Sequence, residues 1–306
     1  MGAFDGLRRG QATHGYWGKH TSSIDWCEIN YEHTPYVAEF INTITNVPVI
    51  SAGIYGAIAT VRGGVAKRYS LLYLGLSLIG IGSFGFHASL RWEWQLLDEL
   101  PMIYVVSFAT YLVWDTRPTF DFLFGIFGPL LVIAWCLFVT FSYIYLPNPI
   151  YHQVAFAFIL LSAVTRNAVL LRRIPSTHPS RKLIGKTLLK GSLIFAIGFG
   201  IWNLDNIFCS EFRSTRDALY PYAIWLDGHG IWHLMTGYGS LLIFAAAIYL
   251  SLAIKTSPDT YAFDGDAWFP IVKAKTPSER SSKDSKIKLD QAKSPIPIDE
   301  KQAIAK

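Results

Sequence analysis

The stretch Gly228–Ile254, GHGIWHLMTGYGSLLIFAAAIYLSLAI, decides the fold of this chain. Roughly 20 apolar residues are enough for a helix to cross the hydrocarbon of a bilayer, so this run predicts a membrane-spanning helix. His229 and His233 lie at its start, and residues four apart share one face of a helix. Ionisable side chains are costly inside a membrane, so two imidazoles on one face point to a function.

Apolar runs of similar length recur along most of the chain. Of its 306 residues, 51% are hydrophobic and only 16% are charged, which is too apolar for an ordinary soluble domain. We therefore predict an all-α integral membrane protein built as a bundle of seven transmembrane helices. The predicted spans are 40–61, 69–90, 97–114, 120–145, 150–172, 187–206 and 228–254.

The basic residues predict the orientation of this bundle. Lys and Arg concentrate in the links after the first, third and fifth predicted spans, and such links stay in the cytosol. This places the N-terminus in the lumen and the C-terminus in the cytosol, and the high pI reports topology rather than nucleic-acid binding. We divide the chain into a lumenal segment 1–38, a transmembrane catalytic domain 39–254 and a disordered cytosolic tail 255–306, whose composition cannot bury a core.

Five polar side chains are expected to converge at the lumenal end of the bundle. His87 lies near the lumenal end of the second predicted span, and Ser83 lies one turn deeper on the same face. Asp98 falls in the first turn of the third span, and His229 and His233 fall in the first two turns of the seventh. Three helices therefore bring these groups to one depth.

This set predicts a metal centre. Two histidines four apart on a helix can ligate one metal, and His87 would be a third ligand. Three protein ligands with a position left for water are the catalytic arrangement of zinc. Asp98 is then the candidate general base, and Ser83 the candidate donor to an oxyanion. The alternative is that these histidines are satisfied polar residues at helix ends. The remaining histidines lack such partners and are expected to be surface or loop residues: His14, His20, His33, His152 and His178.

A second cluster precedes the first predicted span, in SSIDWCEINYEHTPYVAEFINTITN, residues 22–46. Carboxylate and amide oxygens at alternating positions suit a hard cation such as calcium, although acidic loops are usually just solvated. Asn42 and Asn46 follow Glu39 at helical spacing, so this span has a polar face that we expect to look inward. The acidic and amide residues of the cluster are Asp25, Glu28, Asn30, Glu32 and Glu39, with Trp26 between them.

The cysteines predict one covalent link. Cys27 and Cys209 both fall on the predicted lumenal side, where disulfides persist, so we predict that they pair, with two free thiols as the alternative. Cys136 falls within a span and is expected to be inert packing.

Six blocks of this sequence resemble, in order, those of the alkaline ceramidases, the seven-span hydrolases of the endoplasmic reticulum and Golgi. The blocks are IDWCEINY, AEFINTITN, GIGSFGFHASL, QLLDELPMIY, NLDNIFC and HGIWHLMTGYG. The resemblance covers roughly residues 16 to 255, and several blocks in one order are far more specific than any single motif.

The resemblance implies a set of ligands and an activity. It implies zinc at His87, His229 and His233 with Asp98 and Ser83 beside it, and a disulfide between Cys27 and Cys209. It implies a substrate, ceramide from the bilayer, cleaved at its amide to a sphingoid base and a fatty acid, with phytoceramide or dihydroceramide favoured. We expect no nucleic acid and no obligate protein partner. The calcium ligands that it implies are Asp25, the backbone oxygen of Trp26, Glu28, Asn30 and Glu39.

Two other functions compete with this one. Receptors of the adiponectin type also resemble the arrangement of three histidines and one aspartate, but they are expected to have the opposite topology and to lack the DWCE segment. A transporter would need polar groups through the full depth of the membrane, whereas here they crowd at one end.

Overall fold

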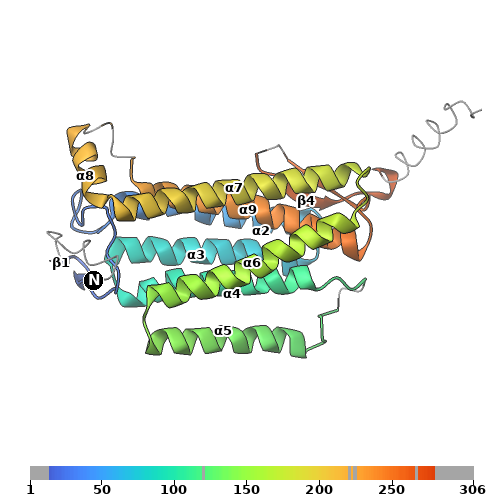
Figure 1. Ribbon diagram of the computed structural model, residues 1–306, viewed down its shortest axis with the longest axis horizontal. Helices are drawn as coiled ribbons and strands as arrows, with labels where there is room; N and C mark the ends of the chain where they lie inside the picture. Colours follow the sequence, from blue (N-terminus) through green and yellow to red (C-terminus); the bar gives the residue numbers. More distant parts are fainter. Residues whose placement is uncertain (1–13, 119–120, 220–221, 223–225, 266–267, 280–306) are drawn as a thin grey trace, which may run out of the picture.

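Seven long helices form an elongated bundle in the computed structural model, which describes residues 14–118, 121–219, 222, 226–265 and 268–279. Each is long and apolar enough to cross a membrane, which confirms the predicted fold class (Figure 1). The elements are α1 (Phe40–Ile44), α2 (Asn46–Arg62), η2 (Lys67–Tyr69), α3 (Ser70–Ser89), α4 (Trp92–Trp114), α5 (Phe127–Tyr145), α6 (Pro149–Arg173), α7 (Pro179–Ile207), α8 (Cys209–Ala218) and α9 (Gly228–Lys255).

The helix ends differ from the predicted spans where polar residues continue a helix beyond its apolar run. Helix α7 begins eight residues before the predicted start, because His178 accepts a hydrogen bond from Ser180 N and Pro179 suits a first helical position. Helix α4 begins at Trp92, so Asp98 lies in its second turn rather than its first. In the other direction, α5 begins at Phe127, seven residues later than predicted.

The first span is divided into α1 and α2 at Thr45. Pro48 has no N–H to donate to the carbonyl of Ile44, so the regular helical ladder is interrupted there. This break leaves the hydroxyl of Thr45 next to α9, where it meets His233.

Helix α9 packs against α1, α2, α3, α4, α6 and α7, whereas α5 lies at the edge of the bundle (Figure 1). Within their most apolar windows, 72% of the residues of α9 are buried inside the protein, against 17% for α5. Small residues bring α7 and α9 together, because a Cβ at Gly191 would lie 2.9 Å from the carbonyl oxygen of Gly239. The central helix therefore carries the histidine pair on a well-supported backbone.

Short elements close the two ends of the bundle. One end carries the hairpin of β1 (His14–Gly15) and β2 (Gly18–Lys19) together with α8, which was not predicted. The other end carries the antiparallel hairpin of β3 (Tyr261–Asp264) and β4 (Ile271–Ala274).

The second hairpin corrects the prediction of a disordered tail from residue 255 onward. Tyr261, Ile271 and Val272 are buried, and Ala274 N donates to the carbonyl of Gly63 at the end of α2. These apolar side chains find a surface on α2 and α9 that composition alone does not indicate. The remainder of the predicted tail, 280–306, and the first 13 residues lie outside the described part of the chain.

Candidate metal centre

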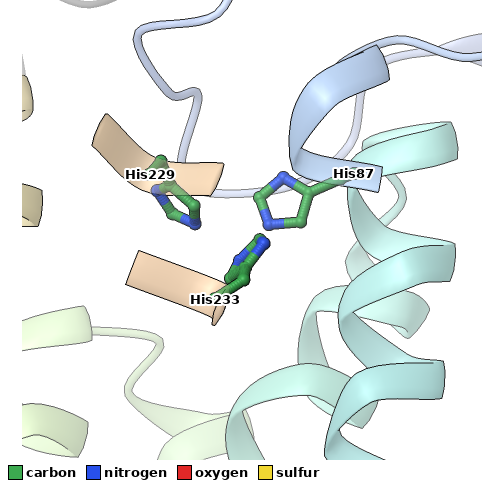
Figure 2. Close-up of side chains that lie close together, drawn as sticks. All are labelled: His87, His229 and His233. Atoms are coloured by element: carbon green, nitrogen blue, oxygen red, sulfur yellow. The ribbon is translucent and has the colours of Figure 1, made fainter. Parts of the chain in front are cut away.

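His87, His229 and His233 converge, as the sequence predicted. One candidate ligand atom of each lies within 4.8 Å of the others. Figure 2 shows the three rings around one point, with His87 reaching it from α3 and the other two from α9. All three are buried, and this is the one such group of His, Cys, Asp or Glu side chains found among the described residues.

The environment of His87 fits a metal ligand. Its Nδ1 lies against the Glu39 carboxylate, while its buried Nε2 has no hydrogen-bond partner among the described residues. A carboxylate that holds the Nδ1 proton leaves the Nε2 lone pair available, which is the usual arrangement around a metal-bound histidine. A buried nitrogen left without a partner is otherwise unfavourable, and a cation at this point would complete the site.

His233 is oriented in the same way, by the first span. Its Nδ1 lies 3.0 Å from Thr45 Oγ1 and 3.3 Å from Asn46 Nδ2, and its Nε2 lies 3.4 Å from Ser83 Oγ. The ring therefore has its Nδ1 side fixed by α1 and α2, and its Nε2 side turned toward Ser83.

His229 is held by aromatic rings. The indole of Trp26 lies over it with ring centres 4.5 Å apart, and Trp202 Nε1 donates to His229 Nδ1 at 3.1 Å. An imidazole that binds a metal through Nε2 carries its proton on Nδ1, where it would face this indole N–H. Metal binding through that nitrogen thus requires a local shift of Trp202 or His229.

Ser83 and Asp98 meet because α3 and α4 approach closely. The Ser83 hydroxyl donates to the Asp98 carboxylate and accepts from Asn46 Nδ2 at 3.0 Å. A Cβ at Gly82 would lie 2.0 Å from the carbonyl oxygen of Leu97 and 2.7 Å from Asp98 N, so no larger residue fits there. The glycine is what allows a serine on one helix to reach an aspartate on the next.

The acidic residues before α1 fold into a buried cluster beside His87. Asp25, Glu28, Asn30 and Glu39 are all buried, and Asn30 Nδ2 donates to Asp25 Oδ1 at 3.0 Å. Asn30 Oδ1 has no hydrogen-bond partner within the described residues. Trp26 N donates to Glu39 Oε1 at 3.2 Å, so Glu39 contacts both this cluster and a candidate zinc ligand.

Two carboxylates of this cluster have unusual proton affinities. Burial, reinforced by the negative charge of Asp227, raises the pKa of Glu28 to about 8. Burial and the nearby Asp25 and Glu28 hold the pKa of Glu39 well above its usual range. Glu28 also receives Ile41 N (2.6 Å) and Asn42 N (2.8 Å), so it caps α1. Arg216 offsets part of the negative charge at Glu28, and the pKa of Glu28 is still raised, so carboxylates crowded in this way favour the binding of a cation.

A disulfide ties this segment to the start of α8. Cys27 and Cys209 are bonded, with Cα atoms 5.5 Å apart, which is the predicted pair, while Cys136 is a free, partly buried thiol. Arg216 donates to the carbonyl of Cys27 (3.1 Å) and pairs with Asp227 (2.6 Å), the residue that caps α9 through Gly230 N. The acidic segment is thus fastened to the start of the helix that carries His229.

Sequence reasoning missed several residues that hold the histidines. The inward polar face expected for the first span is present, since Asn42 and Asn46 are buried. This pattern in the sequence could have indicated the contact between Asn46 and His233. Trp202 carried no signal, because only the tertiary fold brings α7 to His229. His152 was expected at the surface, yet it is buried against α4, where its Nε2 bonds to the carbonyl of Glu99.

Comparisons with known proteins agree with this arrangement. The sequence profile of the Ceramidase family matches residues 18–273. Alkaline ceramidase 3 of Mus musculus is 38% identical over 241 residues, which cover 77% of this chain and 86% of that protein. An alkaline ceramidase of Saccharomyces cerevisiae is 33% identical over 292 residues, covering 88% and 90%.

A plant relative extends the same result. An alkaline ceramidase of Arabidopsis thaliana is 29% identical over 234 residues, covering 74% of this chain and 82% of that protein. The match to the family profile includes the acidic segment, the three histidines and the second hairpin except for its last residue, Ala274. With seven helices suited to crossing a membrane and a buried candidate metal site, the chain belongs to the alkaline ceramidase family of membrane enzymes.

Proposed function

We propose that this protein is a zinc-dependent amidase that hydrolyses ceramide, with phytoceramide or dihydroceramide as preferred forms. The observation that carries the proposal is the convergence of His87, His229 and His233 at a buried point, in a chain of this family. The alkaline ceramidases to which it is similar are named for the same substrate class.

The zinc ligands in this proposal are the three histidines. Zinc, when bound, would supply a Lewis acid that lowers the pKa of a water molecule to about 7 and polarises a carbonyl group. Glu39 orients His87, whose Nε2 has no hydrogen-bond partner among the described residues. Thr45 and Asn46 orient His233, whose Nε2 lies 3.4 Å from Ser83 Oγ and would turn to the metal.

In this proposal Asp98 transfers protons, and Ser83 stabilises the negative charge that develops on the amide oxygen. Asp98 accepts the proton of the water that attacks the amide carbon, and later returns it to the leaving nitrogen, so that amide and water become carboxylic acid and amine. Ser83 donates its hydroxyl to the oxygen that becomes negative. Because Asn46 already occupies an acceptor site of Ser83, the Ser83 hydroxyl proton is directed outward, to Asp98 or to the oxyanion.

Calcium is the proposed cation of the acidic cluster. Its ligands would be carboxylate and amide oxygens of Asp25, Glu28, Asn30 and Glu39 with the backbone oxygen of Trp26. Since Glu39 also contacts His87, calcium would stabilise the segment that orients a zinc ligand.

The proposed setting is the membrane of the endoplasmic reticulum or Golgi, with the metal end of the bundle toward the lumen. Basic residues gather in the links at the opposite end, which is the bias of cytosolic loops. A disulfide at the metal end suits an oxidising compartment. A lipid substrate can reach this depth from the bilayer without leaving hydrocarbon.

The test is a metal analysis of the detergent-purified protein, run with release of free sphingoid base from a panel of ceramides. We expect about one zinc per chain and hydrolysis in the wild type, and loss of both in His233→Ala. Zinc without hydrolysis of any ceramide would favour a receptor. Absence of zinc would mean that the three histidines pack in the core and do not bind a metal.

A further inference from the structure

A second polar cluster lies against Asp98, on the side of α4 that meets α5 and α6. Tyr143 OH donates to Glu99 Oε2 at 2.5 Å, and His152 Nε2 donates to the carbonyl oxygen of Glu99 at 2.7 Å. Gln95 Nε2 reaches the same carboxylate at 3.3 Å. We call Gln95, Glu99, Tyr143 and His152 the Glu99 cluster; it joins three helices at one turn of α4.

This turn of α4 is weak by itself. Pro101 lies inside the helix, where it removes the hydrogen bond to the carbonyl of Leu97 and its ring presses on that group. Asp98 lies between these two residues. Gly82 supports the turn from α3, because its lack of a side chain lets Leu97 and Asp98 approach. The Glu99 cluster supports it from α5 and α6.

Most of the cluster is closed to solvent. Gln95 and Tyr143 are fully buried, His152 is 5% exposed and Glu99 is half-buried. Buried polar groups that are mutually bonded hold their elements rigidly, since breaking any one bond leaves a desolvated partner.

We propose that the Glu99 cluster positions Asp98. Its hydrogen bonds hold the turn of α4 that Pro101 weakens, so that the Asp98 carboxylate keeps its hydrogen bond with Ser83. This inference rests on the proposed function for the role of Asp98. Tyr143 and His152 are then positioning residues that act on Asp98 through Glu99, since no contact of either with the three histidines is found among the described residues.

The experiment compares substitutions in and outside the cluster. Tyr143→Phe and His152→Leu each remove one hydrogen bond to Glu99, and His152→Gln keeps an N–H donor at similar reach. Tyr104→Phe is the matched control, because Tyr104 OH lies 2.5 Å from Thr140 Oγ1 and links the same two helices, α4 and α5, further from Asp98. For each variant, kcat and KM on ceramide, zinc per chain, and hydrogen exchange of the amides in 92–100 are measured.

We expect Tyr143→Phe and His152→Leu to lower kcat by roughly tenfold to 100-fold, since small displacements of a reacting group have effects of this size. KM and zinc content should stay near wild type, because the zinc ligands lie on α3 and α9. Exchange in 92–100 should become faster in these two variants and stay unchanged in His152→Gln and Tyr104→Phe.

Two results would overturn the inference. One is a loss of kcat in Tyr104→Phe as large as in Tyr143→Phe, which would make the cluster ordinary helix packing. The other is unchanged exchange in 92–100 in both cluster variants. A wild-type protein that releases no sphingoid base would instead refute the proposed function, and the exchange measurement would still decide whether the cluster holds this turn.

Discussion

The two ends of the bundle both bury ionisable side chains, but they treat them in opposite ways. At the end that carries the β3–β4 hairpin, Asp115 is fully buried and pairs with Lys255 (2.9 Å) and Arg68 (3.3 Å). At the other end, three imidazoles gather around one point, and His87 Nε2 has no hydrogen-bond partner among the described residues. The first group compensates its own charge; the second leaves a ligand atom available.

This difference separates a structural cluster from a candidate site. The Asp115 group connects η2, the C-terminal end of α4 and α9, and its opposite charges satisfy one another at the cost of desolvation. The histidine group has no such closure, so a cation is what completes it. Buried polarity alone does not indicate function, whereas buried polarity with an open ligand position does.

The largest effect should come from the proposed base. Asp98→Asn removes the proton acceptor but keeps the shape and the contact with Ser83, so turnover of ceramide should fall by roughly 10²- to 10⁴-fold. Zinc content measured on the same preparation should be unchanged. Turnover equal to wild type would remove Asp98 from the mechanism.

The corresponding change at the other end should affect stability instead. Asp115→Asn leaves Lys255 and Arg68 buried beside a neutral group, which we expect to cost about 3 kcal/mol of unfolding free energy. Thermal unfolding in detergent should show the loss, while kcat of the folded fraction stays near wild type. If kcat fell with retained stability, the two ends would be coupled and the comparison would fail.

A smaller effect is expected from the close approach of α3 and α4. Gly82→Ala forces a methyl group against Leu97 and Asp98, which should cost about 1–3 kcal/mol and lower turnover by separating Ser83 from Asp98. Gly200→Ala is the control, because a Cβ at Gly200 meets nothing within 4 Å. Unfolding and turnover of the two variants should differ; equal behaviour would show that the contact at Gly82 is unimportant.

The smallest effect concerns calcium and pH. Burial raises the pKa of Glu28 to about 8 without a cation, so protons compete with calcium below that pH. The folded protein then holds a proton that the unfolded chain releases, and without calcium stability falls as pH rises from the ordinary pKa toward 8.

Calcium bound at the proposed site would reverse this trend by replacing the proton. The increase in Tm on adding calcium should therefore grow with pH up to about 8 and level off above it, and the apparent affinity should change by at most about tenfold per pH unit for one proton. Titrating calcium against Tm at several pH values, with Glu39→Gln as a second variant, tests this. A calcium effect independent of pH would exclude Glu28 as a ligand.

The seven spans and the main site residues could be predicted because they follow from local rules. A bilayer requires about 20 apolar residues per helix, and helical spacing places His229 beside His233 and Ser83 below His87. Counting residues along each predicted span then placed Asp98 at the same membrane depth as the three histidines. Each of these steps uses only residues close together in the sequence.

Other features depended on the tertiary structure. The hairpin within the tail exists because Tyr261, Ile271 and Val272 find a surface on α2 and α9. His152 is buried because α6 crosses α4 at the turn of Glu99.

The sequence by itself thus determined the membrane class, the number of spans and the residues able to bind a metal, since hydrophobicity and helical periodicity are local properties. Only the tertiary structure decided that His87 Nε2 is left without a hydrogen-bond partner among the described residues, that Glu39 contacts His87, and that Gly82 lets Ser83 meet Asp98. Those contacts join residues far apart in the chain, and their geometry depends on how whole helices pack.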